Sequence, residues 1–412
     1  MAVDSVHSST SDSSSLAMTP IERRASASLA GIFALRMLGL FLVLPVFAIE
    51  ARRYPGGEDP VMLGLAMGIY GLTQGLLQLP FGMASDRFGR KRVIVLGLVV
   101  FALGSFWAAA ATDLSSLLVG RSLQGAGAVS AAVTALLADL TRDEVRTKAM
   151  ALVGGSIGLM FALSLVVSPL LTAWIGLPGL FWLTGLLALL GVGVVIWGAP
   201  AAPMPEVGQH RGRLRDVLVN ADLMRLNVGV FVLHAVQLAM WVAVPALLVQ
   251  AGLQTAQHWQ VYLPAVLVSF LFLGVVFTLE RRGHLKKAFL LSIALIVVVE
   301  GGLFWQSMGT THLSAMAVLL LLFFCGFNAL EATQPSLASR MAPRALRGTA
   351  MGVYNTLQSF GFFVGGLMGG WLVKSWGTPA LFLCCGGALL GWLLVAWPMQ
   401  TPGRVVTSAP VA

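Results

Sequence analysis

Three carboxyl groups stand inside, or at the edge of, long apolar stretches of the chain. Glu300 and Glu331 lie well within such stretches, and Asp139 lies at the end of another. A carboxyl group that leaves water favours its neutral form, so it can take up and release protons near neutral pH. The three residues are therefore candidates for groups that exchange protons.

Two arginines and a histidine interrupt other apolar stretches. An Arg at the centre of a membrane span costs about 2.5 to 3.5 kcal/mol on insertion scales, so it needs a partner or a water-filled cavity. Arg36 lies some 14 Å deep at about 1.5 Å per residue, which favours a paired or functional role. Arg121 is nearer the end of its stretch and has the alternative of reaching lipid headgroups. His234 has the alternative of a hydrogen-bonded structural role.

The composition sets the class of protein that carries these groups. Of 412 residues, 57% are hydrophobic and 10% are charged, against about 25% charged in a soluble domain. A water-soluble fold of this size cannot hide so much apolar surface. The three cysteines lie in apolar runs, where a thiol behaves as a small hydrophobe, so we expect neither disulfides nor a metal site.

Charged clusters and Pro/Gly-rich turns divide the chain into twelve apolar segments. About 20 residues cross a bilayer core, so each segment is long enough to span it. The segments lie near residues 27–49, 61–83, 92–111, 116–138, 149–172, 178–198, 225–249, 259–279, 286–307, 313–337, 348–372 and 378–398.

The distribution of basic residues predicts the orientation of these spans. If the termini share one side, 21 of the 26 Lys and Arg residues lie on that side and three on the other. Basic loops stay in the cytoplasm, so both termini are expected there. The net charge of +9 is thus explained by membrane topology, and we expect no nucleic-acid partner.

The longest break between spans, residues 199–224, lies near the middle of the chain and predicts a cytoplasmic linker between two six-helix halves, 25–198 and 225–398. Residues 1–24 and 399–412 are expected to be cytoplasmic tails, the first of them disordered. Two short motifs recur once in each half. Asp86-Arg87-x-Gly89 is echoed by Glu280-Arg281-x-Gly283, and Arg146-x-x-Ala149-Met150 by Arg347-x-x-Ala350-Met351, as parallel repeated halves require.

The loop between the second and third spans contains a compact charged motif. Gly89 suits a tight turn, and Asp86 is placed to meet basic side chains or a helix N-terminus. The fourth span adds a second motif, Arg121-x-x-Gln124-Gly125-x-Gly127-Ala128. The residues of the loop motif are Gly82, Asp86, Arg87, Gly89, Arg90 and Lys91.

In these two motifs the chain resembles the proton-coupled drug and metabolite antiporters of the major facilitator superfamily. The resemblance implies that the loop motif is a conformational latch. Asp86 would face the turn Gly348-Thr349-Ala350 before the eleventh span, and Arg87 would pair with Asp139. It also implies that spans 1, 4, 7 and 10 line a central cavity, whereas the ninth span, with Glu300, is peripheral. The cavity candidates are Arg36, Arg121, Gln124, His234, Gln237, Trp241, Asn328 and Glu331.

The fifth span matches the antiporter pattern only in part. It is rich in glycine, but Ser168 precedes Pro169 where those antiporters have Gly, and leucines follow. Some relatives also carry a small cytoplasmic C-terminal domain. Since this chain ends 14 residues after the last predicted span, we expect no such domain.

The sequence therefore predicts an all-α membrane protein with twelve transmembrane helices in two pseudo-symmetric halves. The resemblance implies a secondary active transporter of a bacterial inner membrane that exports a hydrophobic or amphipathic small molecule by proton antiport. A symporter for a polar or anionic metabolite and a non-transporting receptor are the alternatives. We expect a monomer whose partners are substrate, protons and the lipid bilayer, with no cofactor, nucleotide-binding loop or enzymatic activity.

Overall fold

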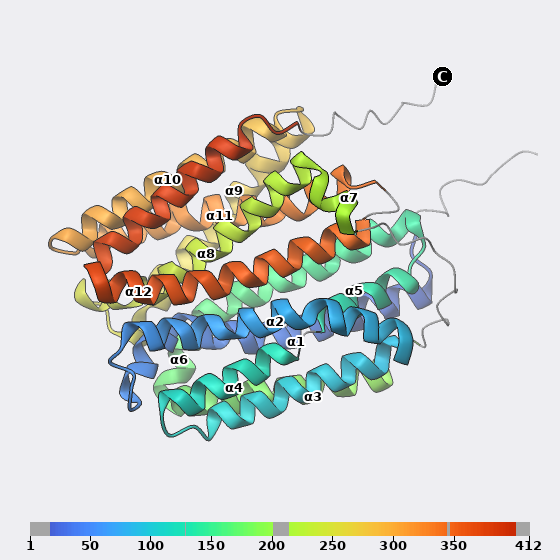
Figure 1. The fold of residues 1–412 in the computed structure, drawn as a ribbon, viewed down its shortest axis with the longest axis horizontal. Coiled ribbons are helices and arrows are strands. Elements are labelled where there is room, and N and C mark those ends of the chain that lie inside the picture. The colour runs from blue at the N-terminus through green and yellow to red at the C-terminus, as the bar shows by residue number, and fades with distance from the viewer. Residues whose placement is uncertain (1–16, 128, 201–213, 344–346, 401–412) are drawn as a thin grey trace, which may run out of the picture.

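The computed structural model describes residues 17–127, 129–200, 214–343 and 347–400, and this part of the chain is built from helices (Figure 1). The α-helices are α1 (Pro20–Glu50), α2 (Pro60–Phe88), α3 (Arg90–Ala109), α4 (Leu114–Ala126), α5 (Ser130–Asp139), α6 (Asp143–Gly193), α7 (Leu214–Val219), α8 (Ala221–Gln250), α9 (Trp259–Arg281), α10 (Leu285–Met308), α11 (Leu313–Met341) and α12 (Arg347–Ala396). Short helical turns follow α1 (Ala51–Arg53) and α6 (Val194–Gly198) and precede α9 (Thr255–Gln257).

Two of these helices are too long to be single membrane spans. Helix α6 has 51 residues and α12 has 50, which is about 75 Å of straight helix against a bilayer core of about 30 Å. Each bends back at a glycine, Gly176 at φ 65° and Gly377 at φ 82°. This left-handed backbone suits glycine, and a proline two residues later helps to end the first leg. Each helix is therefore a hairpin of two spans.

The twelve predicted spans are confirmed. Among the described residues, nine helices are long and apolar enough to cross a membrane, and α6 and α12 each contribute two spans. The remaining span is interrupted and consists of α4 and α5, which are separated near Gly127. Gly127 itself lies so close to Phe101 of α3 that a Cβ atom would come within 2.8 Å of the Phe101 Cβ.

The first helix begins earlier than the predicted end of the tail at residue 24. Thr19 and Glu22 form a reciprocal capping box, and Pro20 occupies the first helical position, where its fixed φ is favourable. Arg24 donates hydrogen bonds to the carbonyl groups of Trp197 and Gly198. The predicted linker likewise contains α7 and the start of α8, and its residues 201–213 lie outside the described part.

The two halves meet most closely along α2 and the first leg of α12, which run side by side in Figure 1. Glycines line this contact on both helices. Gly64 lies directly against Gly366, and a Cβ atom on Gly68 would come within 2.7 Å of the Phe363 carbonyl oxygen. The backbones therefore touch, with no room for larger residues.

The contact between the halves loosens toward the end of the bundle that holds the termini. Near the opposite end, the Lys374 ammonium bridges the halves by binding the Asp59 carboxylate at 2.8 Å. Toward the terminal end, the Cβ position of Gly352 approaches α2 only through the Leu79 side chain, at 4.0 Å, and nothing lies within 4 Å of the Cβ position of Gly348. The halves are thus closed, by this bridge and by the backbone contacts of the glycines, at the end opposite α7.

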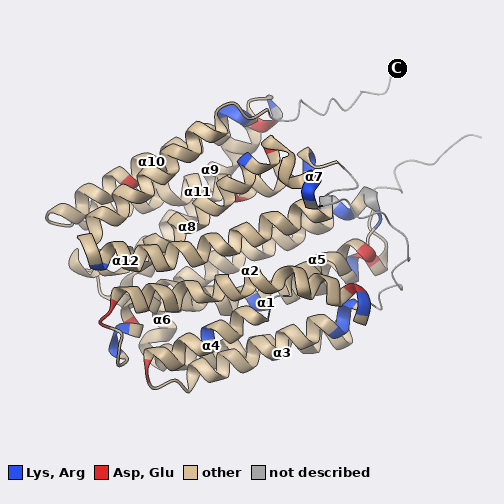
Figure 2. Ribbon diagram, viewed as in Figure 1, with Lys and Arg blue, Asp and Glu red and all other residues tan. Residues whose placement is uncertain are grey.

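The charged side chains follow the same axis. Figure 2 shows Lys and Arg gathered mainly at the end of the bundle that carries α7 and the C-terminus, with few at the opposite end. Basic residues also appear midway along α1 and α4, inside the apolar body. These internal arginines form one part of the candidate site.

Candidate functional site

The first part of the candidate site is a pair of buried arginines in the N-terminal half. Arg36 of α1 is 1% exposed. Its guanidinium donates hydrogen bonds to the Tyr70 hydroxyl at 2.6 Å and to the Ser130 hydroxyl at 3.1 Å, and it lies 5.7 Å from the centre of the Phe101 ring. Such contacts stabilise a cation away from water.

Arg121 of α4 lies over the ring of the same tyrosine. Its carbon Cζ is 5.2 Å from the centre of the Tyr70 ring, and it donates to Gln124 Oε1 at 2.8 Å. Gln124 in turn donates to the Ser105 hydroxyl at 2.8 Å. Arg121 is only 4% exposed, so the alternative that it reaches lipid headgroups is wrong.

The arginine pair lacks an acidic partner within the described part of the chain. The ion pairs found there include neither Arg36 nor Arg121, and the Nε atom of Arg36 makes no hydrogen bond. A buried cation held only by dipoles and aromatic rings keeps an attraction for anions. Among the described residues, the two buried guanidinium groups of the N-terminal half have no carboxylate paired with them.

The second part lies in the C-terminal half and joins two predicted residues. His234 of α8 and Glu331 of α11 approach each other with Nε2 and Oε2 3.3 Å apart. The His234 side chain is 2% exposed and the Glu331 side chain 37%, so the Glu331 side chain is partly accessible while the imidazole is enclosed. Oε2 itself is shielded from solvent and forms no hydrogen bond within the described residues.

The His234 ring is held by contacts from its own helix and from α11 and α12. Nδ1 lies 2.8 Å from the Val230 carbonyl oxygen, and Nε2 lies 2.7 Å from the side-chain nitrogen of Gln358. The rings of Phe327 and Phe362 pack edge to face against the imidazole, with centroids 6.1 and 4.9 Å away. Its orientation is therefore well defined.

The other predicted cavity residues lie on the same helices but make separate contacts. Gln237 is buried, and its Oε1 finds no partner in the described chain. Asn328 donates to the Ser269 hydroxyl of α9 at 2.8 Å. Trp241 packs against Tyr262 with ring centroids 5.6 Å apart.

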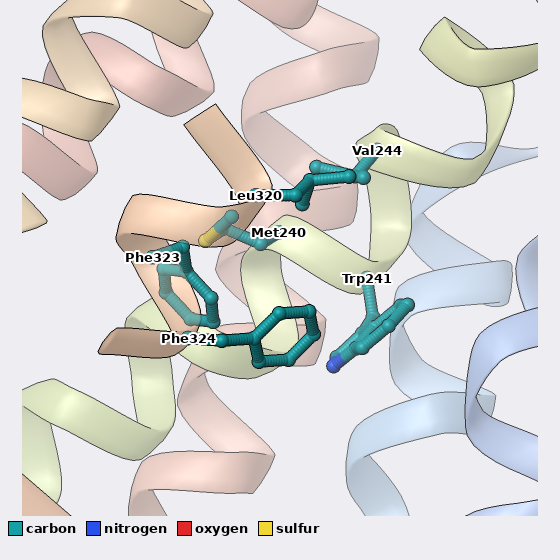
Figure 3. A pocket seen from close by; sticks show the side chains of 6 residues that line it. All are labelled: Met240, Trp241, Val244, Leu320, Phe323 and Phe324. Carbon is teal, nitrogen blue, oxygen red and sulfur yellow. The ribbon is translucent and has the colours of Figure 1, made fainter. Parts of the chain in front are cut away.

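Trp241 also lines a small apolar pocket between α8 and α11. Figure 3 shows the indole facing the Phe324 ring, with Met240 and Phe323 beside them. Val244 and Leu320 complete the lining. The lining of this small pocket is apolar apart from the indole nitrogen of Trp241.

Glu300 lies on a different helix from both groups. It is fully buried on α10, and neither carboxyl oxygen has a hydrogen-bond partner among the described residues. The Cβ position of Gly386 in the second leg of α12 is 3.6 Å from the Glu300 Cβ. Glu300 is thus packed against the second leg of α12, and its place in a peripheral span stays a prediction.

The loop motif forms an ion-pair network, but with a different arginine from the expected one. Asp139 binds the Nε atom of Arg90 at 2.9 Å, and Arg90 also pairs with Asp86. The expected partner, Arg87, instead lies with its guanidinium 5.4 Å from the Phe88 ring. Gly89, at φ 93°, ends α2 and redirects the chain, so the side chain that follows the turn is the one that reaches α5.

The remaining residues of the loop motif have structural contacts. Lys91 donates to the Ala199 carbonyl group, and the Cβ position of Gly82 lies 3.6 Å from the Ala131 side chain. The expected approach of Asp86 to the turn at residues 348–350 stays a prediction.

Two residues that complete the candidate site were not among the predicted ones. Tyr70 lies on α2 and Gln358 on α12, which are not among the four spans expected to line the cavity. The available signal was their polarity within apolar stretches, because a buried polar side chain needs a partner.

Comparisons with known proteins agree with this architecture. The model of the Major Facilitator Superfamily matches residues 29–366. The inner membrane transport protein YajR of Escherichia coli strain K12 is 43% identical over 395 residues, covering 94% of this chain and 86% of YajR. The multidrug resistance protein MdtH of Yersinia enterocolitica is 27% identical over 349 residues, covering 82% of this chain and 83% of MdtH.

A solved D-xylose-proton symporter has the same fold, with a TM-score of 0.72, 16% identity and coverage of 92% of this chain and 98% of the symporter. At this identity the likeness concerns the fold alone. The family match and the identity with YajR, together with the twelve spans, place the chain by descent: it belongs to the Major Facilitator Superfamily of membrane transporters.

Proposed function

We propose that the protein exports a hydrophobic or amphipathic small molecule in exchange for protons, by alternating access. The observation that carries this proposal is the pair of Glu331 and His234, an acid and a base 3.3 Å apart of which the acid is partly exposed. A carboxyl group in this position can bind a proton from one side and release it to the other when the halves move.

The surroundings of the pair favour an apolar cargo. Phe327 and Phe362 enclose the imidazole, and the pocket beside Trp241 is lined by apolar side chains (Figure 3). A relative, MdtH, is named a multidrug resistance protein. These points support efflux of amphipathic compounds by this chain.

The closed end of the bundle and its charge distribution favour one orientation. We propose that both termini face the cytoplasm of a bacterial inner membrane, where YajR is located, because basic residues gather at the terminal end (Figure 2). In that orientation the bridge between Lys374 and Asp59 closes the outer end. We also propose that the chain works as a monomer.

The loop motif supports alternating access as well. We assign Asp86, Arg90 and Asp139 to a latch near the membrane surface, where their ion pairs are weak enough to open and close. Gly82, Arg87, Gly89 and Lys91 shape or flank the turn.

A second function, proton-coupled uptake of an anionic metabolite, is favoured by one observation. Arg36 and Arg121 are buried without an acidic partner in the described chain, and arginines of this kind recognise carboxylates and phosphates. In this alternative, Gln124 would help to orient the anion.

One experiment separates the two functions. Purified protein in proteoliposomes is subjected to a pH jump, and the flux of a panel of amphipathic cations, neutral compounds and organic anions is measured. If the protein is an antiporter, substrate moves in the direction opposite to the proton flux. If it is a symporter, substrate and protons move in the same direction. Absence of any pH-driven flux across the panel would refute proton coupling.

A further inference from the structure

Gln358 holds a position at His234 that the mechanism above leaves unused. Its side-chain nitrogen is 2.7 Å from Nε2 of His234, and the opposite ring nitrogen, Nδ1, is 2.8 Å from the Val230 carbonyl oxygen. A carbonyl oxygen only accepts hydrogen bonds, so Nδ1 carries the proton of the neutral imidazole. Nε2 is then an acceptor, and the Gln358 amide donates to it.

The same ring nitrogen is also the target of Glu331. Oε2 of Glu331 lies 3.3 Å from Nε2 but is buried without a hydrogen bond in the described chain. A neutral Nε2 has one lone pair, which Gln358 already occupies. A protonated Nε2 is a donor, and the nearby carboxylate is then the better partner than an amide N–H group.

We propose that Gln358 is a positioning residue whose hydrogen bond to Nε2 keeps His234 neutral and thereby keeps the transported proton on Glu331 until that hydrogen bond breaks. When Gln358 withdraws, the O–H bond of Glu331 breaks and an N–H bond forms at Nε2 of His234. The neutral pair becomes a carboxylate and an imidazolium, and no further reactant is needed. This inference rests on the proposed proton coupling.

The position of Gln358 links this proton site to the contact between the halves. The next residue, Ser359, presents its carbonyl group to Gly71 of α2, so closely that no side chain fits there. One turn later, Phe362 packs on the His234 ring at 4.9 Å, and the Phe363 carbonyl oxygen lies against Gly68. Gln358 therefore lies on the stretch of α12 that contacts both α2 of the other half and α8, the helix that carries His234.

Few other titratable groups face this site. Tyr354 lies one turn before Gln358 on α12 and interacts electrostatically with Glu331, while its hydroxyl donates to Gln334 Oε1 at 3.3 Å. On the facing helix α2, Tyr70 is engaged by Arg36. Within the described residues, Tyr354 is thus a titratable neighbour of Glu331, and the transfer proposed here involves Glu331 and His234 alone.

The protonation of His234 can be measured directly by ¹⁵N NMR of histidine-labelled protein in nanodiscs, with the signal assigned by the difference spectrum of His234→Gln. In Gln358→Leu, the donor to Nε2 is lost. We expect the imidazolium fraction at a fixed pH near 7 to rise by up to about ten-fold, since one hydrogen bond is worth a factor of that order. Gln358→Glu, which keeps the side-chain shape, should raise it further by placing a carboxyl group at Nε2.

The matched control is Gln334→Leu, which removes a hydrogen bond between α11 and α12 but does not touch His234. An unchanged imidazolium fraction in both Gln358 variants, or an equal rise in the control, would overturn the role of Gln358. The proposed function has a separate test. If Glu331→Gln retains pH-driven flux, proton coupling through Glu331 is refuted, independently of the NMR result for His234.

Discussion

The two halves of the transporter share a fold but carry opposite chemistry in their interiors. The N-terminal half encloses Arg36 and Arg121, which hold a permanent positive charge and contact Tyr70. The C-terminal half holds Glu331 and His234, whose charges depend on bound protons. The arginines attract the pair of Glu331 and His234 when the pair carries a net negative charge, and this attraction is lost when the pair binds a proton. Proton binding can therefore bias the contact between the halves.

This division predicts the largest effect for Glu331→Gln. The variant removes the proton-binding group while keeping its shape, so proton-driven flux should fall by roughly a hundred-fold or more, as a lost proton-transfer group does elsewhere. The measurement is pH-jump flux in proteoliposomes.

The matched control for that variant is Glu300→Gln, in a carboxyl group that is buried on another helix, α10, against Gly386. We expect near-normal flux. If the control and not Glu331→Gln abolished flux, the proton site would belong to the peripheral spans.

Next in size is Arg36→Met, which removes one fixed charge and leaves the Tyr70 and Ser130 hydroxyl groups without their shared partner. Loss of charge-assisted hydrogen bonds of about 1.5 to 3 kcal/mol each should reduce flux by roughly 10- to 100-fold. Flux and its dependence on pH are compared with those of Arg36→Lys, which retains the charge. If folded Arg36→Met matched the wild type, Arg36 would be structural.

A substitution at the contact between the halves tests whether the closed end depends on backbone packing. Gly68→Leu places a side chain where the Phe363 carbonyl oxygen is 2.7 Å from the Cβ position, so the halves should separate there and the outer end should become accessible. Cysteine labelling of introduced sites at both ends measures this shift. Gly274→Leu, where nothing lies within 4 Å, is the control and should leave labelling unchanged.

The latch should give a smaller effect that depends on which arginine is removed. Arg90→Gln breaks the ion pairs with Asp86 and Asp139, and we expect a several-fold change in opening rate, consistent with partly exposed pairs of about 1 kcal/mol or less. Labelling kinetics at the terminal end provide the measurement. Arg87→Gln should change the opening rate less than Arg90→Gln does. A larger effect of Arg87→Gln would support the ion pair between Arg87 and Asp139 that the motif predicts.

The smallest effect concerns the bridge at the closed end. The hydrogen bond from Lys374 lowers the pKa of Asp59 below its ordinary value. The pair therefore stabilises the closed end fully at pH values above the ordinary pKa of an aspartate. This stabilisation is lost as the pH falls through the lowered pKa of Asp59. Acidification below pH about 4 should slightly increase labelling at the outer end, and Asp59→Asn should remove this pH dependence. An equal pH response in the variant would contradict the assignment.

Much of the fold was predictable because apolar length and loop charge act locally. The bends at Gly176 and Gly377 lie in the short breaks between predicted spans. The candidate site residues could be picked out because charged or titratable groups are rare in apolar stretches; they are Arg36, Arg121, His234 and Glu331. The partner of Asp139 was not predictable. It depends on how the turn at Gly89 aims Arg87 and Arg90, which sequence spacing does not encode.

By itself, the sequence determined that the chain spans a membrane in two similar halves, because the hydrophobic effect acts on each segment separately. Only the tertiary structure decided which polar groups meet. Tyr70 and Gln358 reach the arginines and the histidine from helices α2 and α12, and the packing of those helices depends on glycines far apart in the chain. A contact between distant segments is set by the sum of all packing around it, which no local pattern contains.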